Sequence, residues 1–253
     1  MDPPPLLAIS STRETPLLAA DLSIMFMSGF AISKGLCGVL FLGYLLVLIS
    51  PWTLNYLALV PAKTFPFVWN IITAGYIEQS ISELISSILG LLLCGKFLEP
   101  MWTSREFLKF IIFVNTTTLL GVYLTAVAIF HMTKAETLLY VPLSGFHGVL
   151  AGFLVAMKQI APDQDIEVFG CFHLRSEWLP SFFIFMSIFI SIITLEPMQH
   201  LSFVLYGTYW GWVYLRYIQR LPESNIPGTP GGDQFEFSAF FPRFIRYSFL
   251  HLL

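Results

Sequence analysis

Six stretches of the sequence are apolar enough and long enough to form transmembrane helices. A helix that crosses the hydrocarbon core of a bilayer needs about 20 mostly apolar residues. Charged residues make up only 11% of this chain, whereas a soluble domain carries about a quarter. We therefore predict an all-α membrane protein, a bundle of six transmembrane helices at about residues 34–50, 77–98, 107–130, 143–157, 179–195 and 198–217.

The predicted bundle fills most of the chain. Residues 34–220 form one membrane domain, preceded by a cytosolic N-terminal segment, 1–33, and followed by a cytosolic C-terminal tail, 221–253. The apolar stretch 51–75 contains three prolines and lacks helical periodicity, so we expect a loop at the membrane interface rather than a seventh span. The three cysteines lie far apart, without metal-ligand spacing. We therefore expect no disulfide, no metal and no other cofactor, and we expect no nucleic-acid partner.

Lysine and arginine residues gather on one side of the predicted bundle. Six spans place both chain ends on the same side, and that side holds all but two of the 13 Lys and Arg residues. The opposite side has only Lys63 and Lys134. The positive-inside rule therefore places both termini in the cytosol. The same asymmetry favours six spans, because five or seven would mix the two sets.

Ionisable side chains occur near the lumenal ends of three predicted spans. Glu78 and Glu83 lie on the second, His147 on the fourth and His200 on the sixth. Polar groups in hydrocarbon are costly and usually face a bundle interior or a wet cavity. We predict that the four side chains share one lumenal cavity. The alternative is that each bonds a neighbouring helix or reaches the interface by itself.

Small residues on the fourth and sixth spans predict a close contact between them. Glycines spaced four residues apart let two helix backbones approach closely. The residues predicted to pack in this way are Gly145, Gly148, Gly152, Gly207 and Gly211.

The pattern of these glycines resembles the rhomboid superfamily of intramembrane serine proteases. In that family a span 4 serine within GxSGxxxG pairs with a span 6 histidine that is followed by two glycines, as His200 is here. The segment VPLSGFHGVLAG, which begins at Val141, allows two registers. In the first, Ser144 is the nucleophile but two of the glycines are missing. The second keeps all three glycines and has His147 in the nucleophile position; we favour this register.

The second span also departs from the rhomboid pattern, and its departures too indicate a loss of catalysis. Counted from Trp69, the positions of the family's oxyanion-stabilising histidines fall on Glu78 and Glu83, and that of its asparagine falls on Ser87. Acyl transfer needs hydrogen-bond donors aimed at the developing oxyanion, and a carboxylate would repel that charge. We therefore expect a rhomboid scaffold without catalysis, a pseudoprotease.

Several longer motifs are more specific. The segments GKFLEPMW, VAMKQ, WVYLRYIQR and FEFSAFFP, in this order along the chain, resemble the transmembrane protein 115 family, whose plant members are called rhomboid-like protein 19. The resemblance implies a Golgi membrane protein, with the endoplasmic reticulum as second choice, linked to Golgi-to-ER retrograde vesicle transport. The implied partners are membrane lipids, Golgi tethering or trafficking proteins and transmembrane clients. A homo-oligomer is an open alternative.

Other interpretations of the same residues remain open. A Ser144 nucleophile with His200 as its base would make the chain a rhomboid-type intramembrane serine endopeptidase. Ser144 would otherwise cap the fourth helix after Pro142. Glu83, His147 and His200 are acceptable zinc ligands, and a histidine pair could instead sense lumenal acidity.

Glu99 is interpreted as part of the scaffold. It stands at the cytosolic end of the second span. We expect it to bond Arg105 or a helix end in the following loop.

Overall fold

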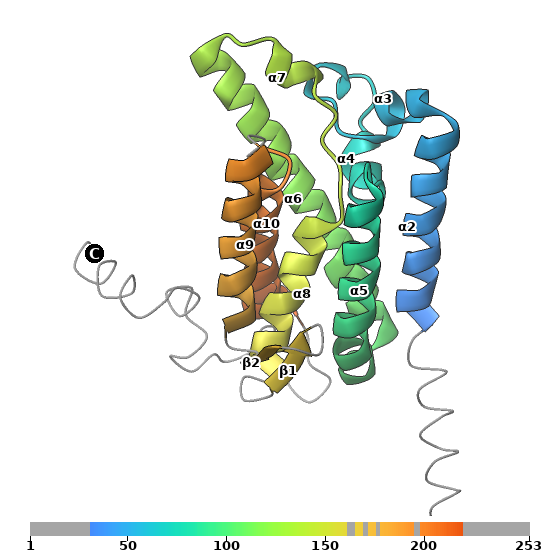
Figure 1. The fold of residues 1–253 in the computed structure, drawn as a ribbon, viewed down its shortest axis with the longest axis vertical. Coiled ribbons are helices and arrows are strands. Elements are labelled where there is room, and N and C mark those ends of the chain that lie inside the picture. The colour runs from blue at the N-terminus through green and yellow to red at the C-terminus, as the bar shows by residue number, and fades with distance from the viewer. Residues whose placement is uncertain (1–30, 161–164, 169–171, 176–177, 195–197, 220–253) are drawn as a thin grey trace, which may run out of the picture.

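The computed structural model describes residues 31–160, 165–168, 172–175, 178–194 and 198–219. Six apolar helices stand side by side in a bundle and alternate in direction along the chain (Figure 1). They are α2 (Ala31–Ile49), α5 (Ile81–Met101), α6 (Ser104–Thr133), α8 (His147–Ile160), α9 (Leu179–Thr194) and α10 (Leu201–Val213), the last continued by a π-helical turn (Tyr214–Ile218).

Three of these helices, α2, α5 and α6, are long and apolar enough to cross a membrane by themselves. The helices α8 and α9 are apolar but shorter, with 14 and 16 residues. Large apolar side chains cover the outside of the bundle: Leu42 is 60% exposed, and Phe185 and Ile192 are each 65% exposed. An apolar exterior of this extent suits lipid and not water, so the structure is that of a multi-pass membrane protein.

Two helices begin four residues later than the sequence predicted. The helix α5 starts at Ile81 rather than near residue 77, so Glu78 lies in the preceding loop. The helix α8 starts at His147 rather than at residue 143, because the chain before it is extended and pairs with another loop. The Leu59 and Leu143 backbones exchange two hydrogen bonds of 2.9 Å each.

The loops at one end of the bundle contain only short helical turns. They include α3 (Leu54–Leu57), α4 (Asn70–Thr73) and α7 (Thr137–Tyr140), and 3-10 turns at Pro51–Thr53, Pro61–Lys63 and Ala74–Tyr76. Figure 1 shows these turns together at the end where α2 stops and α5 starts. Residues 51–75 contain only such short turns, so the prediction of a loop in place of a seventh span is confirmed. This end, which the sequence assigns to the lumen, is called the loop end below.

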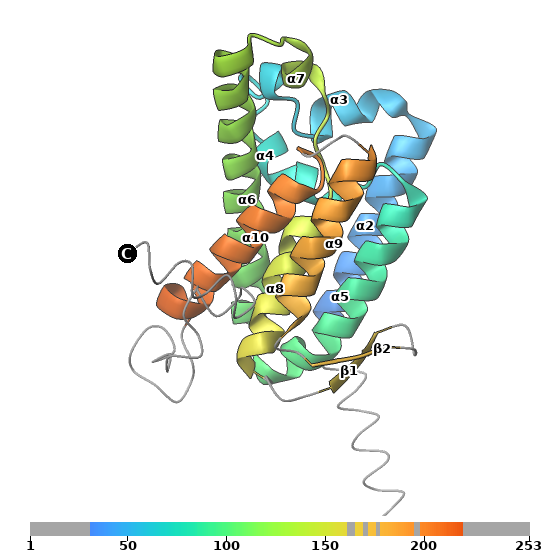
Figure 2. The ribbon, with the colours of Figure 1, turned by 60° about the vertical axis from the view of Figure 1, so that its left-hand side comes forward.

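The opposite end carries the two β-strands that occur among the described residues. The strands β1 (Asp165–Val168) and β2 (Phe172–Arg175) form an antiparallel hairpin between α8 and α9. Figure 2 shows the hairpin next to the end of α5, far from the loop end. The all-α class predicted from the sequence did not include this hairpin, which corrects that detail.

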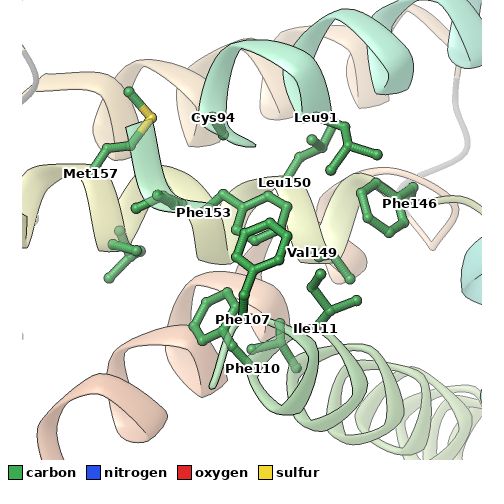
Figure 3. Close-up of a cluster of buried hydrophobic side chains, with 14 of the residues drawn as sticks. Leu91, Cys94, Phe107, Phe110, Ile111, Phe146, Val149, Leu150, Phe153 and Met157 are labelled. Atoms are coloured by element: carbon green, nitrogen blue, oxygen red, sulfur yellow. The ribbon is translucent and has the colours of Figure 1, made fainter. Parts of the chain in front are cut away.

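Aromatic side chains fill the core on the hairpin side of the bundle. The ring of Phe153 on α8 stacks on Phe107 and Phe110 of α6, with centroids 5.4 and 5.6 Å apart. Trp102 adds an edge-on contact to Phe110. Figure 3 shows Phe107, Phe110 and Phe153 close together in the same cluster as Leu91 and Leu150. This tightly packed apolar layer separates the polar groups of the two ends of the bundle.

Glycines bring the backbones of α8 and α10 into contact. A Cβ added to Gly207 would overlap the carbonyl group of Gly148, and one added to Gly211 would lie 2.7 Å from the Cα of Gly152. The start of α8 is thereby fixed beside the start of α10. This contact positions His147 and His200, which stand at those two helix starts.

Candidate functional site at the loop end

The candidate site is built around Glu78, a fully buried carboxylate in the loop before α5. Its Oε1 accepts a 3.1 Å hydrogen bond from the backbone N–H of Phe146 and a 2.7 Å bond from the hydroxyl of Ser87. Phe146 directly precedes α8. The carboxylate therefore lies at the N-terminus of α8, where the unsatisfied N–H groups and the helix dipole favour negative charge.

The neighbouring residue, Gln79, fixes the chain that leads into α8. Its Nε2 donates to the carbonyl oxygen of Pro142 at 2.8 Å and to the hydroxyl of Ser144 at 3.0 Å. Gly145 follows with a φ of 134°, a conformation that side-chain-bearing residues rarely adopt. Its N–H donates to the carbonyl oxygen of Ala74 at 3.1 Å. Together these bonds hold the extended segment in one position.

Two buried polar atoms beside Gly145 have no hydrogen-bond partner among the described residues. They are Oε2 of Glu78 and Nδ1 of His147. A Cβ added to Gly145 would lie 2.5 Å from Nδ1 of His147 and 3.5 Å from Oε2 of Glu78. Both atoms therefore lie close to Gly145, at a position where any side chain would overlap the His147 ring. Buried polar groups usually have a partner, so this pair requires a functional explanation.

The imidazole of His200 completes the site. His200 precedes α10, and its ring meets the ring of His147 edge to face, with centroids 5.3 Å apart and planes at 83°. The imidazole of His200 thus packs against His147, while the hydroxyl of Ser144 accepts its hydrogen bond from Gln79. Ser144 does not cap α8 as one interpretation expected, because the helix begins three residues later, at His147.

The site favours the neutral form of its buried acid. Burial raises the pKa of the Glu78 carboxyl from its ordinary value of 4.5 to about 7. The hydrogen bonds from Ser87 and Phe146 and the nearby His200 act in the opposite direction, but they do not outweigh the loss of hydration.

All four residues predicted to share a cavity lie at the loop end, and the Glu83 carboxylate is near enough to His147 to act on it electrostatically. Glu78 and His147 face Gly145, and His147 contacts His200. The fourth, Glu83, lies in the first turn of α5, where its carboxylate accepts a 3.3 Å bond from the backbone N–H of Gln79. Within the described ranges no group of three or more His, Cys, Asp and Glu side chains is placed to hold a metal ion, so the zinc interpretation has no geometric support there.

Gln79 is the site residue that the sequence analysis missed. A single polar amide next to an acidic residue has no distinctive spacing. Its role depends on a contact with a segment more than 60 positions away. Only the adjacent Glu78, itself an unusual residue in an apolar stretch, could have drawn attention to it.

A second buried carboxylate serves a different helix at the opposite end. Glu99 accepts hydrogen bonds from the backbone N–H of Ile32 at 3.0 Å, the N–H of Ser33 at 3.2 Å and the Ser33 hydroxyl at 2.6 Å. It therefore caps the N-terminus of α2. The expected partners, Arg105 or a helix end in the following loop, were wrong, although the expected scaffold role agrees with these bonds.

The chain is an integral multi-pass membrane protein, because its helix bundle has an apolar exterior and buries polar groups at the helix starts. The chain belongs to the family described as eukaryotic integral membrane protein (DUF1751), which matches residues 34–251. The family expected from the sequence motifs is thereby confirmed.

The curated relatives carry the names expected from those motifs. The chain is 49% identical over 222 residues to rhomboid-like protein 19 of Arabidopsis thaliana, which covers 88% of this chain and 72% of the relative. It is 30% identical over 241 residues to human transmembrane protein 115, covering 92% of this chain and 66% of the relative. The transmembrane protein 115 homolog of Saccharomyces cerevisiae is 28% identical over 211 residues, with 75% and 61% covered. No solved structure matches the chain.

Proposed function

We propose that this protein is a catalytically silent, rhomboid-like Golgi membrane protein that binds other membrane segments or trafficking partners during Golgi-to-ER retrograde transport. The proposed topology has six spans with both termini in the cytosol. Its support is the distribution of charge: Lys96, Arg105 and Lys158 lie at the hairpin end of the bundle, whereas the loop end has Lys63 and Lys134.

The observation that carries the non-catalytic proposal is the pairing of Ser144 with Gln79. A serine nucleophile needs a base within hydrogen-bond reach, and an amide N–H is a donor that cannot take the hydroxyl proton. The imidazole of His200 packs instead on His147, which stands where α8 begins. In its ionised form, the buried Glu78 nearby would oppose an oxyanion rather than stabilise it.

A cleavage assay tests this proposal. Purified protein in liposomes would be incubated with a substrate whose transmembrane helix carries helix-destabilising residues, beside an active rhomboid as positive control. We expect no cleavage by the wild-type chain, by Ser144→Ala or by His200→Ala. Cleavage that both substitutions abolish would instead establish the alternative, a serine endopeptidase with a Ser144/His200 dyad. Labelling of Ser144 by a serine-directed phosphonate would have the same consequence.

The proposed location needs a separate test. The full-length protein would carry a fluorescent tag, and its overlap with Golgi and ER markers would be measured together with the rate at which a retrograde cargo returns to the ER. We expect Golgi overlap and slower retrieval after depletion. Residence in the ER, or unchanged retrieval, would overturn this part of the proposal. Tethering proteins and membrane lipids are proposed as partners from the family resemblance, and a homo-oligomer is the open alternative.

A further inference from the structure

The two oxygens of the Glu78 carboxyl have different surroundings. Oε1 accepts hydrogen bonds from the backbone N–H of Phe146 at 3.1 Å and from the hydroxyl of Ser87 at 2.7 Å. Oε2 is buried and meets no donor among the described residues. An ionised carboxylate accepts through both oxygens, whereas a carboxylic acid has one oxygen that accepts and one O–H group that donates. The asymmetry therefore fits the acid form, with the proton on Oε2.

Glu99 shows the pattern expected of an ionised carboxylate in the same bundle. Its Oε1 accepts from the backbone N–H of Ile32, and its Oε2 accepts from the N–H and the hydroxyl of Ser33. Both oxygens thus face donors, which leaves no oxygen to carry a proton. The two buried glutamates differ in the groups around them, and those groups favour different protonation states.

A proton on Oε2 of Glu78 needs an acceptor, and Nδ1 of His147 lies close to it. Both atoms are within 3.5 Å of one point, the position of a Cβ on Gly145. Nδ1 is buried without a partner in the described part of the chain, although the His147 side chain as a whole is partly exposed. A neutral imidazole with its proton on the other nitrogen offers Nδ1 as an acceptor. One proton therefore satisfies both unpartnered atoms.

Sharing one proton also leaves the pair without net charge. At the described loop end, the Nζ of Lys63 donates to Asn55 at 3.2 Å, and the Nζ of Lys134 lies 6.0 Å from the ring centroid of Phe130. An ionised Glu78 would thus be a buried charge without a hydrogen-bonded cation, which is costly. Burial acts in the same direction, because it raises the pKa of the Glu78 carboxyl to about 7.

Other titratable groups of the loop end surround the pair. His200, before α10, acts electrostatically on Glu78, and Glu83, on α5, acts on His147. The ring of Tyr76, in the turn before Glu78, faces Phe146. None of these groups donates to Oε2 of Glu78. The remaining charged or ionisable His, Lys and Glu side chains described at this end are exposed or half-buried: Lys63, His131, Lys134 and Glu136. Glu196 lies outside the described residues.

We infer that Glu78 is a carboxylic acid that donates its proton to Nδ1 of His147, and that this bond latches the loop before α5 to the start of α8. The bond is lost when Glu78 ionises and also when His147 takes up a second proton. Ionisation of Glu78 creates a buried charge, which frees the segment around Gly145 to reach water. The inference goes beyond the proposed function, because it concerns bonds within the chain. In the proposed topology, lumenal pH would set the state of the latch.

Infrared spectroscopy of the full-length protein in detergent micelles detects this proton. A protonated carboxyl has a carbonyl stretching band separate from the bands of carboxylates. We expect such a band at about pH 6 in the wild type, lost as the pH rises through about 7 and absent from Glu78→Gln. Glu136→Gln, an exposed position of the same end, should keep the band. If Glu78→Gln removed no such band, Glu78 would be ionised and the inference overturned.

Two substitutions at His147 identify the acceptor. His147→Asn keeps an acceptor oxygen close to the backbone, whereas His147→Phe keeps an aromatic ring and removes the acceptor. We expect the carbonyl band to move to higher frequency in His147→Phe, because the O–H group loses its bond, and to stay near the wild-type frequency in His147→Asn. Size-exclusion chromatography checks that each variant is folded. One frequency in all three proteins would overturn the assignment of His147 as the acceptor.

Amide hydrogen exchange tests the latch. Glu78→Gln is a permanent mimic of the acid, because its oxygen can accept from Phe146 and Ser87 while its NH₂ group donates to His147. We expect exchange in residues 141–147, corrected for the intrinsic effect of pH, to rise about fivefold between about pH 6 and pH 8 in the wild type. It should stay constant in Glu78→Gln. An equal rise in both proteins would overturn the latch.

Discussion

The bundle contains two buried glutamates that each stabilise the start of another helix, and they differ in how completely they are satisfied. Glu99, at the hairpin end, uses both carboxylate oxygens to accept bonds from Ile32 and Ser33 at the start of α2. Glu78, at the loop end, uses one oxygen at the start of α8 and leaves the other without a partner among the described residues.

The difference separates a fully hydrogen-bonded carboxylate from one that keeps an unpartnered oxygen. A fully hydrogen-bonded buried acid recovers most of its lost hydration inside the fold. A buried acid with only one oxygen hydrogen-bonded recovers less of its lost hydration, and the fold is less stable for it. Proteins keep such unfavourable features most often at functional sites. Substitution at Glu99 should therefore destabilise the fold more than the same substitution at Glu78.

The largest expected effect is on stability, at the hairpin end. Glu99→Ala removes three hydrogen bonds to a charged acceptor and leaves two backbone N–H groups of α2 unsatisfied. We expect a loss of about 3 kcal/mol in the free energy of unfolding, measured by denaturant titration in detergent micelles. The exposed Glu136→Ala is the control and should change the free energy by less than about 0.5 kcal/mol. A similarly small effect of Glu99→Ala would show that the cap is not structural.

A smaller loss is expected at the loop end. Glu78→Ala removes two hydrogen bonds to Oε1 but also relieves the buried, partnerless Oε2, so we expect a loss of about 1–2 kcal/mol in the same titration. Glu78→Gln keeps an acceptor oxygen and should lie within about 1 kcal/mol of the wild type. A loss at Glu78 greater than that at Glu99 would reverse the comparison between the two acids.

The next effect is a dependence of stability on pH. The folded-state pKa of Glu78, about 7, lies above its ordinary value of 4.5, so the folded protein holds a proton that the unfolded chain has released. This contribution to stability is complete below the unfolded pKa and is lost as the pH rises through the folded pKa. We expect the wild type to lose about 1 kcal/mol between about pH 6 and pH 8 relative to Glu78→Gln. A parallel pH dependence of the two proteins would contradict the assignment.

The smallest expected effects come from the two serines that donate to these acids. Ser87→Ala and Ser33→Ala each remove one hydroxyl hydrogen bond and should each destabilise the protein by about 0.5–1 kcal/mol. They should differ in their pH profiles, because the Ser87 bond lowers the pKa of Glu78. Ser87→Ala should therefore move the stability midpoint to higher pH, while Ser33→Ala, which contacts Glu99, leaves it unchanged. Equal midpoints in the two variants would show that Ser87 does not act on Glu78.

The accuracy of the sequence predictions varied with the range of the interaction involved. The helices α2 and α9 lie within a few residues of their predicted ranges, because hydropathy is a local property. The start of α8 was placed four residues early, since Leu143 pairs with Leu59 across more than 80 positions. The cap predicted for Ser144 failed for the same reason: the hydroxyl is engaged by Gln79, and no local rule relates these two residues.

The sequence by itself determined the membrane class, the family, the apolar helices and the unusual ionisable residues, because each follows from composition, local hydropathy or motif spacing. Only the tertiary structure decided which of those residues meet and which polar atoms remain unpartnered. Glu78 and Glu99 are both acidic residues near the ends of one helix, and their local sequence does not show how completely each is hydrogen-bonded. The difference arises because α2 presents a complete set of donors to Glu99, whereas Oε2 of Glu78 meets no donor among the described residues. Hydrogen bonding depends on atoms brought together from distant segments, and only the folded chain fixes their positions.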